Sequence, residues 1–384
     1  MAQGAVVLII GAGPAGIAVS ACLNRLSIPN MLLEREDCYA SLWKKRTYDR
    51  LKLHLAKQFC ELPHMPFPPG EATFMPKKNF LAYLDDYVSR FNVKPSYGRL
   101  VESASYDGVA KKWRVVAKNV VSDQIEVYVS EFLVVASGEN SLGFIPNLLG
   151  LEGFRGEVLH SCEYGNGDKF RDKDVLVIGS GNSGMEIAFD LSDWGARTSI
   201  VVRNPVHVVT KEMVHLGMAL LNYFPLHIVD DLTVFLSNLK IGDLSNFGLQ
   251  RPAEGPFYLK VKEGTSPIID VGTIDKIKRG EIQASVRRFK DGKSIEFANG
   301  ETKKFDAIVF ATGYRSTVRR WLKGDDGDLF GKDGMPKRAP PNHWKGDKGL
   351  YCAGFARAGL AGISDDAKNI AESIHMILFP QTKT

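Results

Sequence analysis

Residues Val6–Gly16 read VVLIIGAGPAG, and residues Val175–Gly184 read VLVIGSGNSG. Each stretch is an apolar run followed by Gly-x-Gly-x-x-Gly. The first glycine of such a turn permits a tight bend, the second lets the backbone approach a pyrophosphate, and the third lets the next helix pack against the strand. The N-terminus of that helix offers N–H groups and the positive end of its dipole to the phosphates. Two such turns predict that one chain holds two dinucleotides and passes electrons between them.

The residue that closes the next strand distinguishes the two turns. After the first turn, the strand-like run Asn30–Leu33 ends in Glu34, close to the expected position of a ribose-binding carboxylate. A carboxylate there repels a 2′-phosphate, so the first site suits FAD or NAD. After the second turn, the run Thr198–Val202 ends in Arg203, whose guanidinium suits a phosphate and favours NADPH. The alternative for Arg203 is an exposed cation at a strand end.

The predicted cofactor contacts extend beyond the glycines. Trp43 either flanks the flavin or fills the core, and Asn140 and Ser141 follow a strand end that we expect to face the cofactor cleft. The full predicted set is Gly11, Ala12, Gly13, Pro14, Ala15, Gly16, Glu34, Trp43, Asn140, Ser141, Gly179, Ser180, Gly181, Asn182, Ser183, Gly184, Arg203, Thr312, Gly313 and Asp365.

Length and composition limit the class of protein. A chain of 384 residues fits two domains, and 44% apolar with 24% charged residues is typical of a soluble globular protein. The net charge of +5 is small, and no basic run interleaved with aromatics indicates nucleic acid. The uncharged stretch Ala5–Leu23 is interrupted by glycines and a proline and no Lys or Arg precedes it, so we expect neither a signal peptide nor a membrane span. These features predict a soluble, cytoplasmic protein with no integral membrane association.

The five cysteines are scattered and include no Cys-x-x-Cys. This pattern argues against a disulfide framework and against a clustered zinc site, so no metal is predicted. It also argues against the disulfide reductases, which share the layout of two nucleotide sites but need two nearby thiols to relay electrons from the flavin.

The order of predicted elements indicates a duplicated architecture. Each turn is followed, after a β-rich excursion, by a strand that ends in Ala-[Ser/Thr]-Gly, at 136–138 and again at 311–313. We therefore predict an α/β fold with two Rossmann-like dinucleotide-binding domains, the NADPH domain inserted in the FAD domain. The predicted FAD-binding domain is discontinuous and comprises 1–168 and 305–384; the predicted NADPH-binding domain comprises 169–304.

Periodicity predicts further elements along the chain. Helices are expected at Lys78–Phe91, at Gly217–Leu239 and from about Ser364, with Asp365 and Asp366 in the first turn of the last helix. Strands are expected at 113–117, 125–129, 131–136, 268–271, 282–286, 294–297, 305–310 and 349–354.

A third motif lies between the two turns and carries a resemblance. Residues Phe154–Tyr164 read FRGEVLHSCEY and match Phe-x-Gly-x-x-x-His-x-x-x-[Tyr/Phe], the signature of the class B flavin monooxygenases. With both glycine turns, the whole chain resembles a flavin-containing monooxygenase. More narrowly, Tyr39–Trp43, Lys57–Pro63 and Asp270–Thr273, together with Tyr48–Leu55 and Gly354–Phe355, resemble the plant YUCCA family. Ser137 departs from the usual threonine and Ala56 from the usual proline.

The resemblance implies an activity that the glycines alone do not indicate. It implies FAD and NADPH as cofactors, and oxidative decarboxylation of indole-3-pyruvate with O₂, through a flavin C(4a)-peroxide, to the auxin indole-3-acetate. His54 lies near the position where such enzymes place a polar side chain at the flavin, so it is the candidate catalytic residue; a structural histidine is the alternative. An N- or S-oxygenating monooxygenase and a non-catalytic regulator that binds NADPH and flavin remain alternatives. The oligomeric state is left open.

Overall fold

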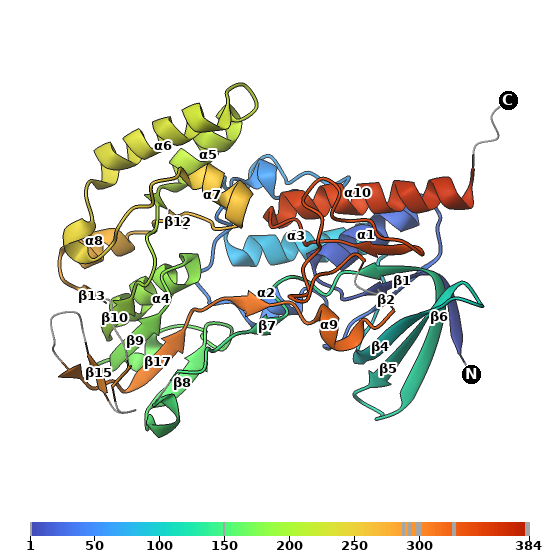
Figure 1. Ribbon diagram of the computed structural model, residues 1–384, viewed down its shortest axis with the longest axis horizontal. Coiled ribbons are helices and arrows are strands. Elements are labelled where there is room, and N and C mark those ends of the chain that lie inside the picture. The colour runs from blue at the N-terminus through green and yellow to red at the C-terminus, as the bar shows by residue number, and fades with distance from the viewer. Residues whose placement is uncertain are drawn as a thin grey trace. The chain divides into compact units, whose positions relative to one another are not determined.

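The computed structural model describes residues 2–148, 150–285, 289–290, 294–296, 302–324 and 328–380. The chain forms two compact units, and the backbone passes between them several times (Figure 1). Unit 1 comprises Met1–Lys45, Lys57–Leu142 and Tyr314–Thr384, and unit 2 comprises Arg46–Ala56 and Gly143–Gly313.

Unit 1 is built on a seven-stranded sheet in the order β3-β2-β1-β6-β5-β4, with β19 also paired to β6. Strands β1, β2, β3, β6 and β19 run parallel, whereas β4, β5 and β6 form an antiparallel meander. The end of β1 is buried because helices cover parallel sheets, which explains its unbroken apolar run. The strands are β1 (Gln3–Ile10), β2 (Asn30–Leu33), β3 (Pro95–Ser96), β4 (Arg99–Asp107), β5 (Lys112–Asn119), β6 (Ile125–Val135) and β19 (Leu350–Cys352).

Two long helices of unit 1, α1 (Pro14–Arg25) and α10 (Gly359–Leu378), pack side by side (Figure 1). Helix α3 (Lys77–Arg90) packs against α1 and α2 (Ser41–Lys45), and α9 (Val318–Trp321) packs against β4. Helix α1 is buried along almost its whole length because it lies between the sheet and its neighbours. The short strands β7 (Leu142–Gly143) and β18 (Tyr314–Arg315) lie at two of the four passages between the units.

Unit 2 is built on a five-stranded, fully parallel sheet in the order β13-β10-β9-β17-β8. Its central strands, β9 (Asp174–Ile178) and β17 (Ala307–Phe310), are buried, as their apolar runs predict. Strand β10 (Arg197–Val201) lies on the other side of β9, and the edge strands are β8 (Glu157–His160) and β13 (Ile282–Ser285). A three-stranded antiparallel sheet follows in the chain, formed by β14 (Phe289–Lys290), β15 (Ser294–Glu296) and β16 (Thr302–Lys303).

A second small element of unit 2 is the parallel pair β11 (Val208–Val209) and β12 (Ile268–Ile269). Helix α4 (Asn182–Asp193) follows the second glycine turn and packs against β9, β10 and β12. Helices α5 (Lys211–Leu220), α6 (Leu226–Ile241) and α7 (Pro256–Glu263) pack in sequence, and α8 (Thr273–Lys278) packs against α4. The core cluster of this unit includes Tyr48, which comes from the short 46–56 stretch.

In both sheets, the order in which the chain adds strands reverses next to a glycine turn. In unit 1 the chain runs from β1 through α1 to β2 on one side, while β6 pairs with β1 on the other side. In unit 2 it runs from β9 through α4 to β10, while β17 pairs with β9 on the other side. Ligands of open α/β sheets bind at the carboxyl ends of the strands where the strand order reverses in this way. The predicted fold class of two Rossmann-like domains is therefore confirmed.

The observed units differ in their boundaries from the expected domains. The sequence predicted boundaries at 168/169 and 304/305, but strands β8 and β17 belong to the parallel sheet of unit 2, so the units change at 142/143 and 313/314. The stretch 46–56 also joins unit 2. Pairing between strands distant in sequence sets these boundaries, and no local pattern reports it.

Several helices differ from their predicted extents. The expected helix Gly217–Leu239 is two helices, because α5 ends at Leu220 and α6 begins after Pro225. The last helix begins at Gly359, so Asp365 and Asp366 lie in its second turn and not, as expected, in its first. The helix expected at Lys78–Phe91 and the antiparallel pair of β5 and β6 are confirmed. The ends of two expected strands, Val286 and Phe297, lie outside the described residues.

Candidate functional site

In the first glycine turn, protein atoms fill the space beside Gly11 and Gly16, but the space beside Gly13 is open. Gly11 has φ +103°, and a Cβ there would lie 2.6 Å from the carbonyl oxygen of Ala136. A Cβ on Gly16 would lie 1.9 Å from the carbonyl oxygen of Gly11, so α1 reaches β1 only because this residue is glycine. At Gly13, in contrast, a Cβ would meet no protein atom within 4 Å. That open side, at the start of α1 with Pro14 as its first residue, suits the close approach of a pyrophosphate.

Glu34 lies directly after β2 and is only 6% exposed. Its carboxylate accepts a hydrogen bond of 2.7 Å from the N–H of Ala12 and one of 3.0 Å from the N–H of Glu36. A carboxylate can accept about four hydrogen bonds, so these two leave capacity for ribose hydroxyls. Glu34 thus fixes the first turn and stands at the position expected for ribose binding.

The second turn repeats this geometry. Gly179 has φ +111°, and a Cβ on it would lie 2.4 Å from the carbonyl oxygen of Ala311, while a Cβ on Gly184 would lie 1.9 Å from the carbonyl oxygen of Gly179. A Cβ on Gly181, the N-cap of α4, would meet nothing within 4 Å. The Ala-[Ser/Thr]-Gly strand ends therefore lie beside the glycine turns, as the duplication predicts. Both turns have the shape that a dinucleotide requires.

Asn182 and Ser183, which follow Gly181 in the second turn, have defined hydrogen-bond partners. The amide of Asn182 accepts from the N–H of Ile269 at 2.7 Å and donates to the carbonyl of Pro267 at 3.2 Å, so it ties α4 to β12. The hydroxyl of Ser183 donates to the phenol oxygen of Tyr48. Arg203 is exposed two residues beyond β10, at the position expected for a 2′-phosphate partner.

The strand end 311–313 is held by the signature histidine. His160 is 3% exposed, its Nε2 lies 3.0 Å from the carbonyl oxygen of Gly313, and its Nδ1 accepts from the N–H of Cys162 at 3.2 Å. These partners select the tautomer with hydrogen on Nε2, and burial lowers the pKa of His160. Thr312 donates its hydroxyl hydrogen to the carbonyl of Phe144. His160 therefore holds the loop beside the second turn.

His54 is part of a buried network in unit 2. Its Nε2 lies 2.7 Å from the carboxylate of Glu186, which is 2% exposed and lies on α4 directly after the glycine turn. The buried hydroxyl of Tyr48 donates to the same carboxylate, and burial raises its pKa well above the usual value. Because Ser183 bonds Tyr48, the chain of contacts runs from the second turn to His54. The sequence analysis named His54 as a candidate but did not name Glu186, the acid that it contacts.

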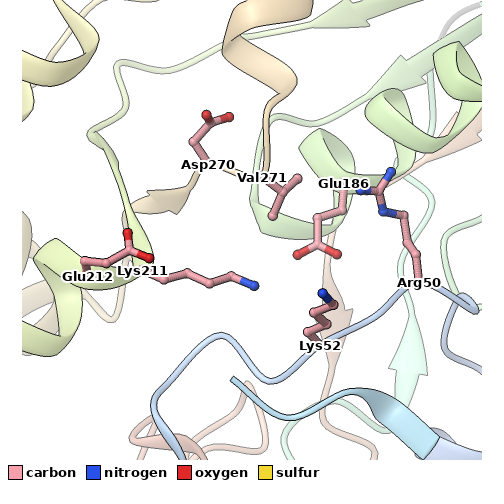
Figure 2. Close-up of a pocket in the computed structure, with 7 residues that line it drawn as sticks. All are labelled: Arg50, Lys52, Glu186, Lys211, Glu212, Asp270 and Val271. Carbon is pink, nitrogen blue, oxygen red and sulfur yellow. The ribbon is translucent and has the colours of Figure 1, made fainter. Parts of the chain in front are cut away.

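A cavity of about 280 Å³ lies in unit 2 next to this network (Figure 2). Its lining residues come from the 46–56 stretch, from α4, from the start of α5 and from the segment after β12. They are Arg50, Lys52, Glu186, Lys211, Glu212, Asp270 and Val271. Lys211 is half-buried, and burial lowers its pKa, while the negative charge of Glu186 acts in the opposite direction. Burial raises the pKa of Asp270.

Other predicted residues have local structural partners. The ring of Trp43 packs edge-on against Phe80, with 4.6 Å between ring centroids. Ser141 donates to the carbonyl of Ser137 at 2.8 Å, which orders the loop after β6, and Asn140 is exposed. Asp365 is exposed and lies 3.5 Å from Lys368. The neighbouring Asp366, in contrast, is buried and accepts a hydrogen bond of 2.9 Å from the N–H of Gly354. The position at which the helix begins decides which of the two aspartates faces the protein interior.

Lys57, Tyr223 and Phe224 also have defined surroundings. Lys57 donates to the backbone carbonyls of Pro68, Pro69 and Glu71, so it organises the proline-rich loop of unit 1. Tyr223 is 81% exposed and Phe224 is 49% exposed, so neither walls an enclosed pocket.

All five cysteines are free thiols. Among the described residues, no group of three or more His, Cys, Asp or Glu side chains is arranged to hold a metal ion. In the same part of the chain, no helix combines the length and the apolar character needed to cross a membrane.

Comparison with known proteins agrees with the architecture. The model of the flavin-binding monooxygenase-like family matches residues 4–319. The probable indole-3-pyruvate monooxygenase YUCCA10 of Arabidopsis thaliana is 56% identical over 97% of this chain and 98% of its own length. The indole-3-pyruvate monooxygenase YUCCA6 of the same plant is 46% identical over 96% of this chain and 89% of its own.

A solved structure supports the fold independently of the sequence. The flavin-containing monooxygenase from Stenotrophomonas maltophilia superimposes with a TM-score of 0.70 at 20% identity, over 98% of this chain and 99% of that one. At this level of identity the likeness concerns the fold alone. The chain has a glycine turn beside the change of strand order in each sheet, with an acid after the first turn and an arginine after the second. The match to the family model and the similarity to the YUCCA proteins over nearly the whole chain show that it belongs to the flavin-binding monooxygenase-like family, and within it to the YUCCA group.

Proposed function

We propose that this chain is an FAD- and NADPH-dependent monooxygenase that converts indole-3-pyruvate to indole-3-acetate. The balanced reaction is indole-3-pyruvate + O₂ + NADPH + H⁺ giving indole-3-acetate + CO₂ + NADP⁺ + H₂O. One observation carries the proposal: identity of 56% to a probable indole-3-pyruvate monooxygenase extends over 97% of this chain and 98% of that relative. Flavin reduced by NADPH supplies the capacity to activate dioxygen, and the protein supplies position and exclusion of water.

The two cofactors divide between the units by the chemistry of the turns. In unit 1, the open side at Gly13 and the carboxylate of Glu34 favour a dinucleotide without a 2′-phosphate, so we assign FAD there. In unit 2, the open side at Gly181 and the exposed cation Arg203 favour NADPH. The predicted contacts of Asn140, Ser141, Trp43 and Asp365 with the cofactors remain proposals.

His54 is the proposed catalytic residue. Because a carboxylate only accepts hydrogen bonds, the contact of 2.7 Å with Glu186 places a hydrogen on Nε2 of His54. Nδ1 is then the nitrogen at which a proton can be held or released. Glu186 thereby sets the tautomer and the ring orientation, as second-layer carboxylates do for other histidines.

The experiment is product analysis with purified protein. Yellow protein that bleaches with NADPH under nitrogen and regains its colour in air is expected, with one indole-3-acetate formed per NADPH when indole-3-pyruvate is present. Amine and thioether substrates serve as the comparison. Turnover of a thioether without turnover of the keto acid would assign the chain to N- or S-oxygenation, and colourless protein that does not retain added flavin would exclude a redox enzyme.

We also propose that the protein works in the cytoplasm. The support is that the apolar stretch Ala5–Leu23 is interrupted by glycines and a proline and forms part of β1, the glycine turn and part of α1, not one continuous apolar helix. A fluorescent fusion located in another compartment would contradict this.

A further inference from the structure

Helix α6 buries polar side chains and exposes apolar ones, which is the reverse of an ordinary surface helix. Its buried residues include Asp230, Thr233 and Ser237, and each of these is bonded to a backbone group of unit 2. The exposed side carries four large apolar residues, each between 38% and 70% exposed, which we call the α6 stripe: Ile228, Leu232, Phe235 and Leu239. Exposed apolar patches are typical of surfaces that bind another molecule.

The α6 stripe has the spacing of a contact between two helices. Its residues follow one another at intervals of four, three and four, so all of them lie on one face of the helix. The same alternation lets the side chains of one helix fit between those of a second helix. The stripe therefore suits another helix that carries apolar residues at matching intervals.

A second copy of α6 supplies such a helix when it lies antiparallel to the first. If Leu232 lies beside Phe235 of the second copy, two-fold symmetry places Phe235 beside Leu232 of the second copy. In this register Ile228 and Leu239 pair in the same way at the two ends. Every residue of the stripe then has an apolar partner, so the stripe is complementary to itself.

The polar groups beside the stripe are complementary in the same arrangement. Asp231 and Asn238 are exposed, and because they are seven residues apart, they lie on the same side of the stripe. The Oδ1 of Asn238 accepts from the guanidinium of Arg251, so the amide hydrogens of Asn238 can be donated to another group. In the antiparallel pair, Asp231 faces the side that holds Asn238 and Arg251 in the second copy. A parallel pair would instead place Asp231 on the side of Leu236, where no donor or positive charge would meet it.

The exposed apolar area matches what a stable pair needs. Helix α5, which packs against α6 (Figure 1), exposes a further apolar residue, and the segment between the two helices exposes two more. At about 200 Å² for a fully exposed large side chain, these residues and the stripe expose about 800 Å², which is the area that one partner contributes to a standard interface. The additional residues are Leu216, Tyr223 and Phe224.

We propose that the α6 stripe is the interface between two copies of this chain, which pack α6 against α6 in antiparallel orientation across a two-fold axis. A membrane surface is another occupant that apolar residues suit, but helices that lie on membranes have a polar face rich in Lys and Arg. The polar face of α6 is buried in unit 2, and its exposed charged residues are Asp231 and Lys240, one of each sign. No excess of positive charge on α6 attracts anionic head groups, so a second copy is the better partner.

The first test is the mass of the full chain, purified with FAD and measured by light scattering and sedimentation over the micromolar range. A dimer is expected for the wild type. Phe235→Glu and Leu239→Glu are each expected to raise the Kd of the dimer about thirtyfold or more, because each replaces an apolar anchor by a charge inside the interface. Val121→Glu places the same charge on an apolar residue of unit 1 that is 89% exposed, and it is expected to leave the Kd unchanged. Unchanged melting temperatures verify that the variants are folded.

Disulfide cross-linking tests the orientation without disrupting the stripe by a charge. A chain that carries both Ile228→Cys and Leu239→Cys is expected to form covalent dimers on oxidation, because these two positions meet across the two-fold axis. Neither substitution alone is expected to cross-link, since the two copies of one position then lie at opposite ends of the pair. The wild type, with its five free thiols, gives the background. Cross-linking by the single variants would contradict the antiparallel arrangement.

The remaining outcomes also decide the matter. A wild type that stays monomeric over the micromolar range overturns the interface, and so does a dimer whose Kd neither stripe variant changes. Flotation of monomeric wild type with vesicles of phosphatidylcholine and phosphatidylserine, lost in Phe235→Glu, assigns the stripe to a membrane and overturns it as well. Dissociation by both stripe variants but not by Val121→Glu supports the interface, whether or not indole-3-pyruvate is turned over.

Discussion

At the scale of single residues, the lack of a Cβ atom has two different roles in the glycine turns. Gly16 and Gly184 are glycines because the protein itself fills the space, with a backbone oxygen 1.9 Å from a Cβ position. Gly13 and Gly181 face no protein atom within 4 Å and have ordinary φ values of −67° and −71°. Alanine is therefore compatible with the fold at the second pair and incompatible with it at the first.

This difference predicts selective loss of cofactors. Gly13→Ala is expected to fold as apoprotein with an unchanged melting temperature but to lose bound FAD, because the methyl group occupies the approach of the pyrophosphate. Gly181→Ala is expected to retain FAD and to weaken NADPH binding by about tenfold or more. Flavin absorbance per protein and the NADPH dependence of flavin reduction measure the two effects. Full flavin retention by Gly13→Ala would contradict the assignment of FAD to the first turn.

Arg203 carries the proposed preference for NADPH. Its exposed guanidinium is available for charge-assisted bonds to a 2′-phosphate. Arg203→Ser is expected to raise the KM for NADPH about tenfold or more and to leave the KM for NADH unchanged, since NADH has no such phosphate. Steady-state kinetics with both nucleotides provide the measurement. Equal effects on both would show that Arg203 acts on the fold or on a shared part of the nucleotide.

His54 and Glu186 form the residue pair whose role is chemical. His54→Ala is expected to leave flavin reduction by NADPH unchanged and to lower the yield of indole-3-acetate per NADPH consumed. Glu186→Gln keeps the size of the side chain but removes the charge that sets the tautomer, so it is expected to lower the same yield and to shift its pH dependence. An unchanged yield in His54→Ala would remove it as a catalytic residue and leave it a structural one.

At the scale of elements, helix α5 positions one end of the cavity. Thr210 is its N-cap and accepts a hydrogen bond of 3.3 Å from the N–H of Met213, and the next residue is Lys211. Thr210→Ala is expected to cost about 1 kcal/mol in the free energy of unfolding, because the first turn of α5 loses its cap. Thr210→Ser retains the cap and serves as control. Urea denaturation gives the stability, and an unchanged midpoint would show that other contacts hold the helix.

The apolar pattern of α6 predicts a helix but does not predict which of its faces is buried. The helix buries Asp230, Thr233 and Ser237, and it exposes Ile228, Leu232, Phe235 and Leu239. The polar side chains are buried because each has a specific partner: Asp230 accepts from the N–H groups of Phe257 and Tyr258, and Ser237 donates to the carbonyl of Val208. The apolar pattern correctly predicted a helix in this region, but the buried face depends on contacts with residues distant in sequence.

At the scale of the whole molecule, two buried histidines predict how stability depends on pH. His160 and His207 are 3% and 5% exposed, and burial lowers the pKa of both below the usual 6.5. The folded state therefore binds protons less readily than the unfolded state, so the stabilisation is complete above pH 6.5 and is lost progressively as the pH falls below it. Thermal melting from pH 8 to about pH 5 is expected to show a decline that His160→Gln and His207→Gln each make shallower. Parallel curves for wild type and variants would contradict this.

The sequence by itself determined the two glycine turns, the charged residues that follow them and the cofactors that they suit. Gly11 and Gly179 must adopt positive φ, and Glu34 and Arg203 stand at fixed distances from their turns, because short-range geometry links strand, turn and helix. The resemblance of spaced motifs identified the family, which the comparisons confirmed. Only the tertiary structure placed β8 and β17 in one sheet, ended unit 2 at Gly313, and brought Lys52, Glu186 and Lys211 around one cavity. Lys52 is distant in sequence from the other two, and their proximity follows from strand pairing and packing, which no local pattern encodes.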